Sequence, residues 1–222
     1  MNKCDHCGKE FTNERTILKH VCEPKRRFLQ RNDHYVRLGF EAFKKFYETV
    51  QNAKPKTIED YDQNRFYTAF NRYGRYCLHT KVIDVPGYTD WLIKNSVKID
   101  DWNRDDVYSL FIKDYLRHEN AEHAVTRSLN YMQKWADQNN CEFNEYFKNI
   151  SPNLALHDIA NGHVSPWLVL NTASGLELLD KFTDEQLAYV NSVLDPQFWA
   201  IKFKRVPAEM EYVKSVLEAA NL

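Results

Sequence analysis

The chain has 222 residues, 43% hydrophobic and 14% aromatic, which is too apolar for a disordered protein and sufficient for a sizeable core. No apolar run approaches the roughly 20 residues that span a bilayer, and the charged N-terminus is unlike a signal peptide, so we expect an intracellular protein with no membrane partner. The net charge of −1 conceals an asymmetry, because residues 1–81 carry 17 Lys and Arg against 10 Asp and Glu, whereas residues 82–222 carry 13 against 21. Only the first third of the chain is therefore suited to approach a polyanion.

Cysteine and histidine in the first two dozen residues are spaced to suit one tetrahedral metal ion. A gap of two residues between Cys4 and Cys7 lets one tight turn deliver both thiolates. His20 and Cys22 lie about 200° apart on an intact helix, so a helix here must end at His20 for both to face one ion, and Pro24 agrees with that end. We predict one Zn²⁺ as the cofactor, with these residues as ligands: Cys4, Cys7, His20 and Cys22.

The segment from Cys4 to His20 resembles a zinc finger of the two-cysteine, two-histidine type. In that family an aromatic and an aliphatic residue form a small core between a hairpin and a helix, and Phe11 and Ile17 fill these positions. The departure from the family is the last ligand, which usually follows the histidine after three to five residues. His6 is an alternative to His20, although it lies inside the cysteine turn. A disordered basic tail would require the register of Phe11, Ile17 and His20 to be coincidental.

The rest of the chain has the spacing and punctuation of helices. Asn32 or Asp33 caps a helix that ends before Pro55, and Thr57 begins a further helical stretch with a capping box. Further helices are predicted at 88–95, 104–117, 121–139, 143–148, 152–161, 166–181, 184–193, 196–204 and 207–220. The predicted fold class is all-α. An N-terminal ββα-like zinc finger at 1–24 is followed by a basic connector at 25–32 and a multi-helix domain at 33–222.

No group of residues in the sequence has the spacing of a catalytic site. His118, Glu119 and His123 are superficially similar to the helix motif of zinc proteases, but that motif needs the two histidines four residues apart. Asn120 between them is instead a candidate helix cap. The sequence also has no phosphate-binding glycine loop and no nucleophile elbow. We therefore expect a protein that is not an enzyme.

Basic residues in the finger and the connector indicate a nucleic-acid contact. If the finger helix begins near Asn13, the resemblance implies that the base-reading positions are Asn13, Arg15, Thr16 and Lys19. The connector continues this surface with Lys25, Arg26, Arg27 and Arg31. Arg65, Arg72 and Arg75 could share one helical face, but an ordinary solvated basic surface explains that helix better. A single finger reads only about 3 base pairs, so specificity would come from the helical part or from a partner.

Two functions are consistent with these features. The first is a non-enzymatic accessory factor that associates with nucleic acid during transcription, replication or packaging of DNA. The alternative is a docking adaptor in a polymerase, replisome, packaging or virion assembly, with the finger as a rigid knob. The whole chain resembles accessory proteins of large tailed bacteriophages, which would place it in the host cytoplasm. Salt dependence separates the two, because binding to DNA weakens steeply with ionic strength.

Overall fold

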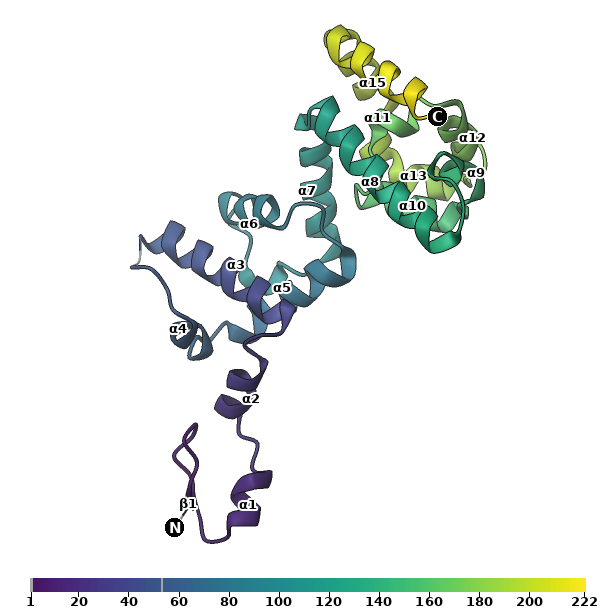
Figure 1. Ribbon diagram of the computed structural model, residues 1–222. Coiled ribbons are helices and arrows are strands. Elements are labelled where there is room, and N and C mark those ends of the chain that lie inside the picture. Colours follow the sequence, from purple (N-terminus) through teal and green to yellow (C-terminus); the bar gives the residue numbers. More distant parts are fainter. Residues whose placement is uncertain (1, 53) are drawn as a thin grey trace. The chain divides into compact units, whose positions relative to one another are not determined.

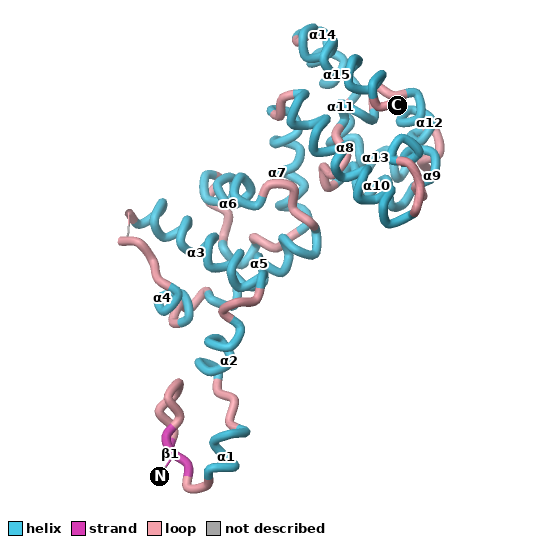
Figure 2. The backbone as a smooth tube through the Cα atoms, viewed as in Figure 1, coloured by secondary structure: helices cyan, strands magenta, loops and turns pink. Residues whose placement is uncertain are grey.

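The computed structural model describes residues 2–52 and 54–222, and it is mostly helical, with strand confined to the N-terminal segment (Figure 2). The predicted all-α class is therefore confirmed at this level. The packing divides the chain into two compact units, residues 1–107 and 108–222. The predicted multi-helix domain at 33–222 extends across both units.

The N-terminal segment contains two short strands and a short helix. Strands β1 (Asn2–Lys3) and β2 (Glu10–Phe11) pair antiparallel, with Asn2 opposite Phe11. Helix α1 (Glu14–Lys19) begins after Asn13, whose side chain caps it, and ends at His20 as the ligand spacing required. Helix α2 (Glu23–Gln30) follows, so the predicted connector is largely helical.

The remainder of the first unit is built on a close contact between two helices that lie side by side (Figure 1). It contains α3 (His34–Gln51), α4 (Ile58–Asp62), α5 (Tyr67–Thr80), α6 (Val85–Lys94) and the 3₁₀ helix η1 (Ile99–Asp101). Helices α3 and α5 approach through glycines. A Cβ on Gly39 would lie 2.7 Å from the Phe70 carbonyl oxygen, and a Cβ on Gly74 would collide with the Tyr35 carbonyl oxygen. Side chains larger than hydrogen would therefore push the two helices apart.

Aromatic rings fill the core of the first unit around Phe70. Its ring lies 5.8 Å from that of Phe43 and 5.6 Å from that of Trp102, both edge-on, and all three side chains are buried. Edge-to-face contacts of this kind stabilise a core beyond the area that they bury. The indole nitrogen of Trp102 donates to the Val97 carbonyl at 3.0 Å, so burial leaves it satisfied.

The second unit has its own aromatic core. Its elements are α7 (Asp105–His118), which begins at the boundary, α8 (Ala121–Asn139), η2 (Phe143–Glu145), α9 (Tyr146–Asn149), α10 (Pro152–Ala160), α11 (Pro166–Val169), α12 (Ala173–Leu179), α13 (Asp184–Leu194), α14 (Pro196–Arg205) and α15 (Pro207–Ala219). Trp167 and Trp199 are buried with ring centroids 6.0 Å apart, and Phe203 packs on both.

The helix boundaries agree with the local signals in the sequence. Thr57 forms the predicted capping box with Asp60, and the hydroxyl of Ser151 caps α10. Two predicted helical stretches are divided in the structure. The stretch that begins at Thr57 forms α4 and α5, and the predicted helix at 166–181 forms α11 and α12. In the second case the cause is Thr172, whose side chain accepts a hydrogen bond from the Gly175 amide and starts α12 anew.

Candidate metal centre

A tight turn places the first two cysteines on the same side of the chain. The Cys4 amide donates to the Lys9 carbonyl at 2.9 Å, and the Gly8 amide donates to the Cys4 carbonyl at 2.8 Å. Gly8 has a φ of +72°, a left-handed conformation that glycine adopts without the steric cost that a side chain incurs. The turn between the short strands therefore depends on a glycine directly after Cys7.

The end of α1 brings the second pair of ligands to the same place. The His20 amide closes the last turn by donating to the Ile17 carbonyl at 3.1 Å, and the His20 backbone is then extended, with ψ of 119°. Cys22 is also extended, with φ of −92° and ψ of 164°. Because both residues are extended, the side chains of His20 and Cys22 can face one point although they are only two positions apart. In an intact helix they would point about 200° apart.

The four predicted ligands form one cluster. The sulfurs of Cys4 and Cys22 are 3.9 Å apart, Cys7 sulfur is 3.3 Å from His20 Nε2, and all four ligand atoms lie within 4.8 Å of one another. With metal–sulfur bonds of about 2.3 Å and metal–nitrogen bonds of about 2.0 Å, a tetrahedron has sulfur–sulfur edges of about 3.8 Å and sulfur–nitrogen edges of about 3.5 Å. The cluster thus has the dimensions of a four-ligand metal site.

The alternative ligand lies outside this cluster. The ring of His6 packs against that of Phe28 at 5.0 Å, and His6 does not belong to the four-residue group. The His20 ring rests on Phe11 at 4.7 Å, so the predicted core aromatic orients the histidine ligand.

Backbone amides affect the thiols unequally. The Cys7 and His6 amides direct hydrogen bonds at Cys4 and lower the pKa of its thiol. At Cys7 the Lys9 amide acts in the same direction, but burial and the neighbouring thiols of Cys22 and Cys4 outweigh it and raise the pKa. Several thiolates in one place repel one another, and a bound cation would remove that repulsion.

The predicted base-reading residues fall on the short helix α1. Asn13 is its cap, and its side-chain oxygen accepts from the Arg15 amide at 2.8 Å. Arg15, Thr16 and Lys19 are exposed. These three side chains are therefore accessible to a partner, whereas the Asn13 oxygen already has a structural use.

The connector cations are engaged within the chain. Arg31 forms an ion pair with Asp62 at 2.6 Å and a second with Glu59 at 2.9 Å. Arg27 donates to the Asp62 carbonyl and pairs with Glu23 at 3.0 Å. Arg26 also pairs with Glu23, and Lys25 Nζ donates to the His20 carbonyl at 3.2 Å. Arg27 and Arg31 thus fasten α2 to α4, a role that sequence reasoning did not predict.

The protease-like group of the second unit does not form a metal cluster. The Asn120 side chain caps α8 by accepting from the His123 amide at 2.8 Å, as its sequence position indicated. Glu119 pairs with Arg127, and His118 Nδ1 lies 2.8 Å from the Asp114 carbonyl. These residues therefore stabilise helix ends.

The sequence analysis did not predict a buried carboxylate in the second unit, that of Asp158. Asp158 accepts from the Tyr131 hydroxyl at 2.6 Å and the Tyr146 hydroxyl at 2.7 Å, and His163 Nδ1 lies 3.3 Å from it. His157, Asp158 and His163 are close enough to hold a metal ion. The tyrosines already satisfy both carboxylate oxygens, so a metal is not needed to explain this burial. The sequence indicates this group only through His157, next to Asp158, and His163, five residues after it.

Comparison of the chain with models of known protein families, with curated proteins and with solved structures finds no match. The resemblance to phage accessory proteins therefore gains no support from relatives. Among the described residues, no helix combines the length and apolar character needed to cross a membrane. The Cys4, Cys7, His20 and Cys22 cluster remains the feature with the most specific chemistry.

Proposed function

We propose that the chain is a zinc-binding accessory protein that associates with nucleic acid through its N-terminal finger and does not act as an enzyme. Three thiolates and one imidazole leave no open coordination position, which is typical of structural zinc. The observation that carries the proposal is that the four ligand atoms converge within 4.8 Å while the adjoining helix keeps its polar face exposed. Zinc would then fix a ββα finger whose helix presents Arg15, Thr16 and Lys19.

Salt-dependent binding tests this proposal. Zinc-loaded protein should bind a duplex without terminal phosphates, measured by fluorescence anisotropy between low and physiological salt. The double variant Arg15→Gln, Lys19→Gln should lower affinity and reduce the slope of log affinity against log salt by about 0.9 for each phosphate that is no longer neutralised. The matched control is Lys204→Gln, Lys214→Gln, which removes two exposed lysines from the acidic second unit. Absence of binding at low salt, or equal effects of both double variants, would contradict the proposal.

The docking adaptor is a second candidate because large apolar side chains before and after Cys22 in the sequence are exposed. Leu18 of α1 is 73% exposed, Val21 66% and Leu29 of α2 63%. Exposed apolar side chains that gather in one patch indicate a surface that a protein partner covers. Under this alternative Leu18→Ser would abolish partner binding, and binding would change little with salt.

A further inference from the structure

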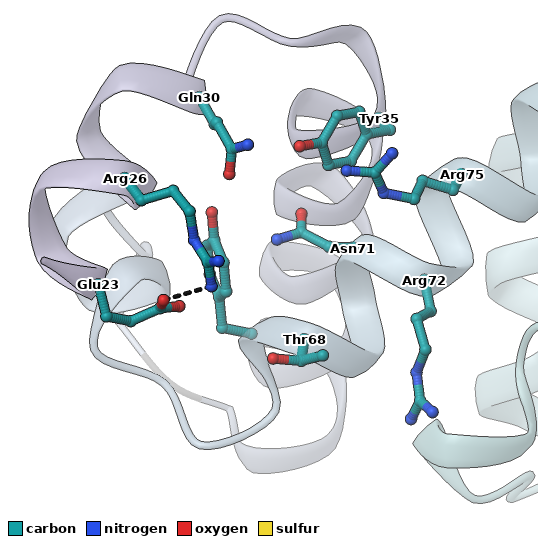
Figure 3. Close-up of a pocket in the computed structure, with 9 residues that line it drawn as sticks. Glu23, Arg26, Gln30, Tyr35, Thr68, Asn71, Arg72 and Arg75 are labelled. Atoms are coloured by element: carbon teal, nitrogen blue, oxygen red, sulfur yellow. Dashed lines mark hydrogen bonds and ion pairs between the residues drawn. The ribbon is translucent and has the colours of Figure 1, made fainter. Parts of the chain in front are cut away.

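A cavity of about 240 Å³ lies between α2, α3 and α5, within the first unit. Arg26 and Gln30 reach into it from α2, Tyr35 lies on α3, and Asn71 and Arg75 extend from α5 (Figure 3). The volume is below the roughly 300–1,000 Å³ typical of drug-sized ligands. One small charged group fits it better than a whole cofactor.

The close approach of α3 and α5 orients one arginine at the rim of this cavity. Because Gly74 has no side chain, the backbone of Tyr35 can approach α5 closely at this position. The Tyr35 ring then lies beside Arg75, whose guanidinium stacks 3.6 Å from the ring centroid. Arg75 is exposed, and its contact with a described side chain is the stacking on Tyr35; the ion pairs among the described residues do not include it. Stacking fixes the plane of the guanidinium and leaves its N–H groups free to bind an anion.

Two neutral hydrogen-bond donors, on Asn71 and Tyr67, face the same space. The Tyr61 hydroxyl donates to Asn71 Oδ1 at 2.9 Å, which fixes the amide orientation and turns the Asn71 nitrogen toward Arg26 and Gln30 (Figure 3). Tyr67 is only 5% exposed and lines the cavity, yet its hydroxyl makes no hydrogen bond with a described residue. Burial raises the pKa of Tyr67, and the nearby Asn71 amide, which is placed to donate to the hydroxyl oxygen, lowers it by less. The hydroxyl therefore stays protonated, and its own O–H remains able to donate.

The charges that line the cavity favour an anion. Glu23 is its only acidic lining residue among those described, and it pairs with Arg26 and Arg27. Arg72 also borders the cavity, but it turns away from the centre and pairs with Asp100 at 2.8 Å (Figure 3). Arg75 is thus left as the cation without a counter-charge, beside the Tyr67 hydroxyl, which has no partner among the described residues, and the Asn71 amide. An unpartnered buried hydroxyl is costly unless a ligand or water satisfies it.

We propose that this cavity binds a terminal phosphate group, with Arg75, Tyr67 and Asn71 as donors and Arg26 as the second cation. Several donors that converge from α5 and α2 suit the oxygens of a tetrahedral phosphate better than a planar carboxylate. A phosphate monoester can enter end-on, whereas a phosphodiester carries substituents on two sides. A mononucleotide, the end of a nucleic-acid strand and free inorganic phosphate all supply such a group. This site goes beyond the proposed function, since binding to duplex backbone does not require it.

Calorimetric titration of the full zinc-loaded chain in phosphate-free buffer tests the site. The probes are inorganic phosphate, adenosine monophosphate, and one short oligonucleotide with and without a 5′-phosphate. Arg75→Gln and the isosteric Tyr67→Phe should each weaken binding about tenfold, as expected for a hydrogen bond to a charged group. The matched control is Arg65→Gln, because Arg65 also stacks on an aromatic ring, that of Phe66 at 4.6 Å, but does not line this cavity.

The outcomes separate the sources of phosphate and the two proposals. Saturable binding of any of the three phosphate-bearing probes, weakened by Arg75→Gln but not by Arg65→Gln, supports the site and identifies its ligand. Equal binding of the oligonucleotide with and without its 5′-phosphate, and no binding of the small probes, would overturn it. Equal losses in both arginine variants would also overturn it. A chain that binds phosphate here but no duplex would support this site and contradict the nucleic-acid proposal alone.

Discussion

The N-terminal segment, residues 2–22 (the predicted finger), and the helical units are each stabilised by different forces. Strands β1 and β2 and helix α1 contain no buried residue, and Cys4 is the buried side chain of that segment. The helical part instead buries large aromatic side chains such as Phe70, Trp102 and Trp167. A segment without a core needs a metal or another cross-link to stay folded, whereas burial of aromatic area suffices for the rest. The two regions should therefore fail independently.

Removal of the metal should have the largest effect and should be confined to the finger. Structural zinc contributes about 10–16 kcal/mol of apparent binding free energy in small zinc-finger peptides, and folding of those peptides depends on it. Metal analysis of the purified chain should find one zinc per molecule, and Cys4→Ser should abolish it. Amide exchange should then increase over residues 2–22 while the helical circular-dichroism signal is retained. A collapse of that signal on chelation would show that the two regions are not independent.

Truncation in the aromatic core should reverse the pattern. Phe70→Ala should lower the free energy of unfolding by about 3–5 kcal/mol, because it removes a fully buried ring that touches Phe43 and Trp102. Its control is Leu78→Ala on the same helix, where the side chain is 39% exposed. Urea titration measures both variants, and the zinc content should be unchanged in each. Loss of zinc from Phe70→Ala would contradict the comparison.

The buried carboxylate of the second unit should contribute less, and in a way that depends on pH. Burial raises the pKa of Asp158, but hydrogen bonds from His163, Tyr131 and Tyr146 outweigh it and hold the pKa below its usual range. The folded state therefore binds the proton more weakly than the unfolded state. The stabilisation is fully present above the unfolded pKa of about 3.9 and is lost as pH falls through the lower folded value.

Asp158→Asn should reduce the free energy of unfolding at neutral pH by about 2–3 kcal/mol, because it leaves buried donors mismatched. Part of the loss of stability below about pH 4 should also disappear in this variant. Asp137→Asn is the control, since Asp137 lies on the exposed face of α8 and contacts only Gln133 in the described hydrogen bonds. An unchanged acid profile for Asp158→Asn would mean that this carboxylate is not ionised in the folded chain.

Most helix boundaries and the metal ligands could be predicted because their signals are local. Capping residues such as Thr57, Ser151 and Asn120 act on amides within three residues, and the spacing of Cys4 and Cys7 is set by one turn. The geometry that lets His20 and Cys22 converge also follows from the period of the helix. These features need no knowledge of tertiary packing.

The other features depend on pairings between distant residues. Tyr131 is 27 residues from Asp158, and Arg31 is 31 residues from Asp62, so nothing in the spacing links them. The division of the helical part into two units and the cavity beside Arg75 arise from packing in the same way. The sequence shows the charge of Arg27 and Arg31, from which a nucleic-acid surface is predicted, but it does not show their carboxylate and carbonyl partners on α4.

The smallest expected effect concerns which region α2 belongs to. Arg31 and Asp62 are 24% and 14% exposed in their side chains, and their ion pair joins α2 to α4. A partly exposed pair contributes about 0.2–1 kcal/mol, so a double-mutant cycle with Arg31→Gln and Asp62→Asn should give a coupling energy in that range, reduced at high salt. Arg31→Gln should be the more destabilising single change, because Asp62 Oδ1 already lacks a partner among the described residues and the carboxylate would keep its charge.

Amide exchange in α2 should increase in Arg31→Gln while the zinc content stays at one per molecule. Zero coupling, or loss of zinc from Arg31→Gln, would place α2 with the finger and move the boundary between the two regions to the C-terminal side of Gln30.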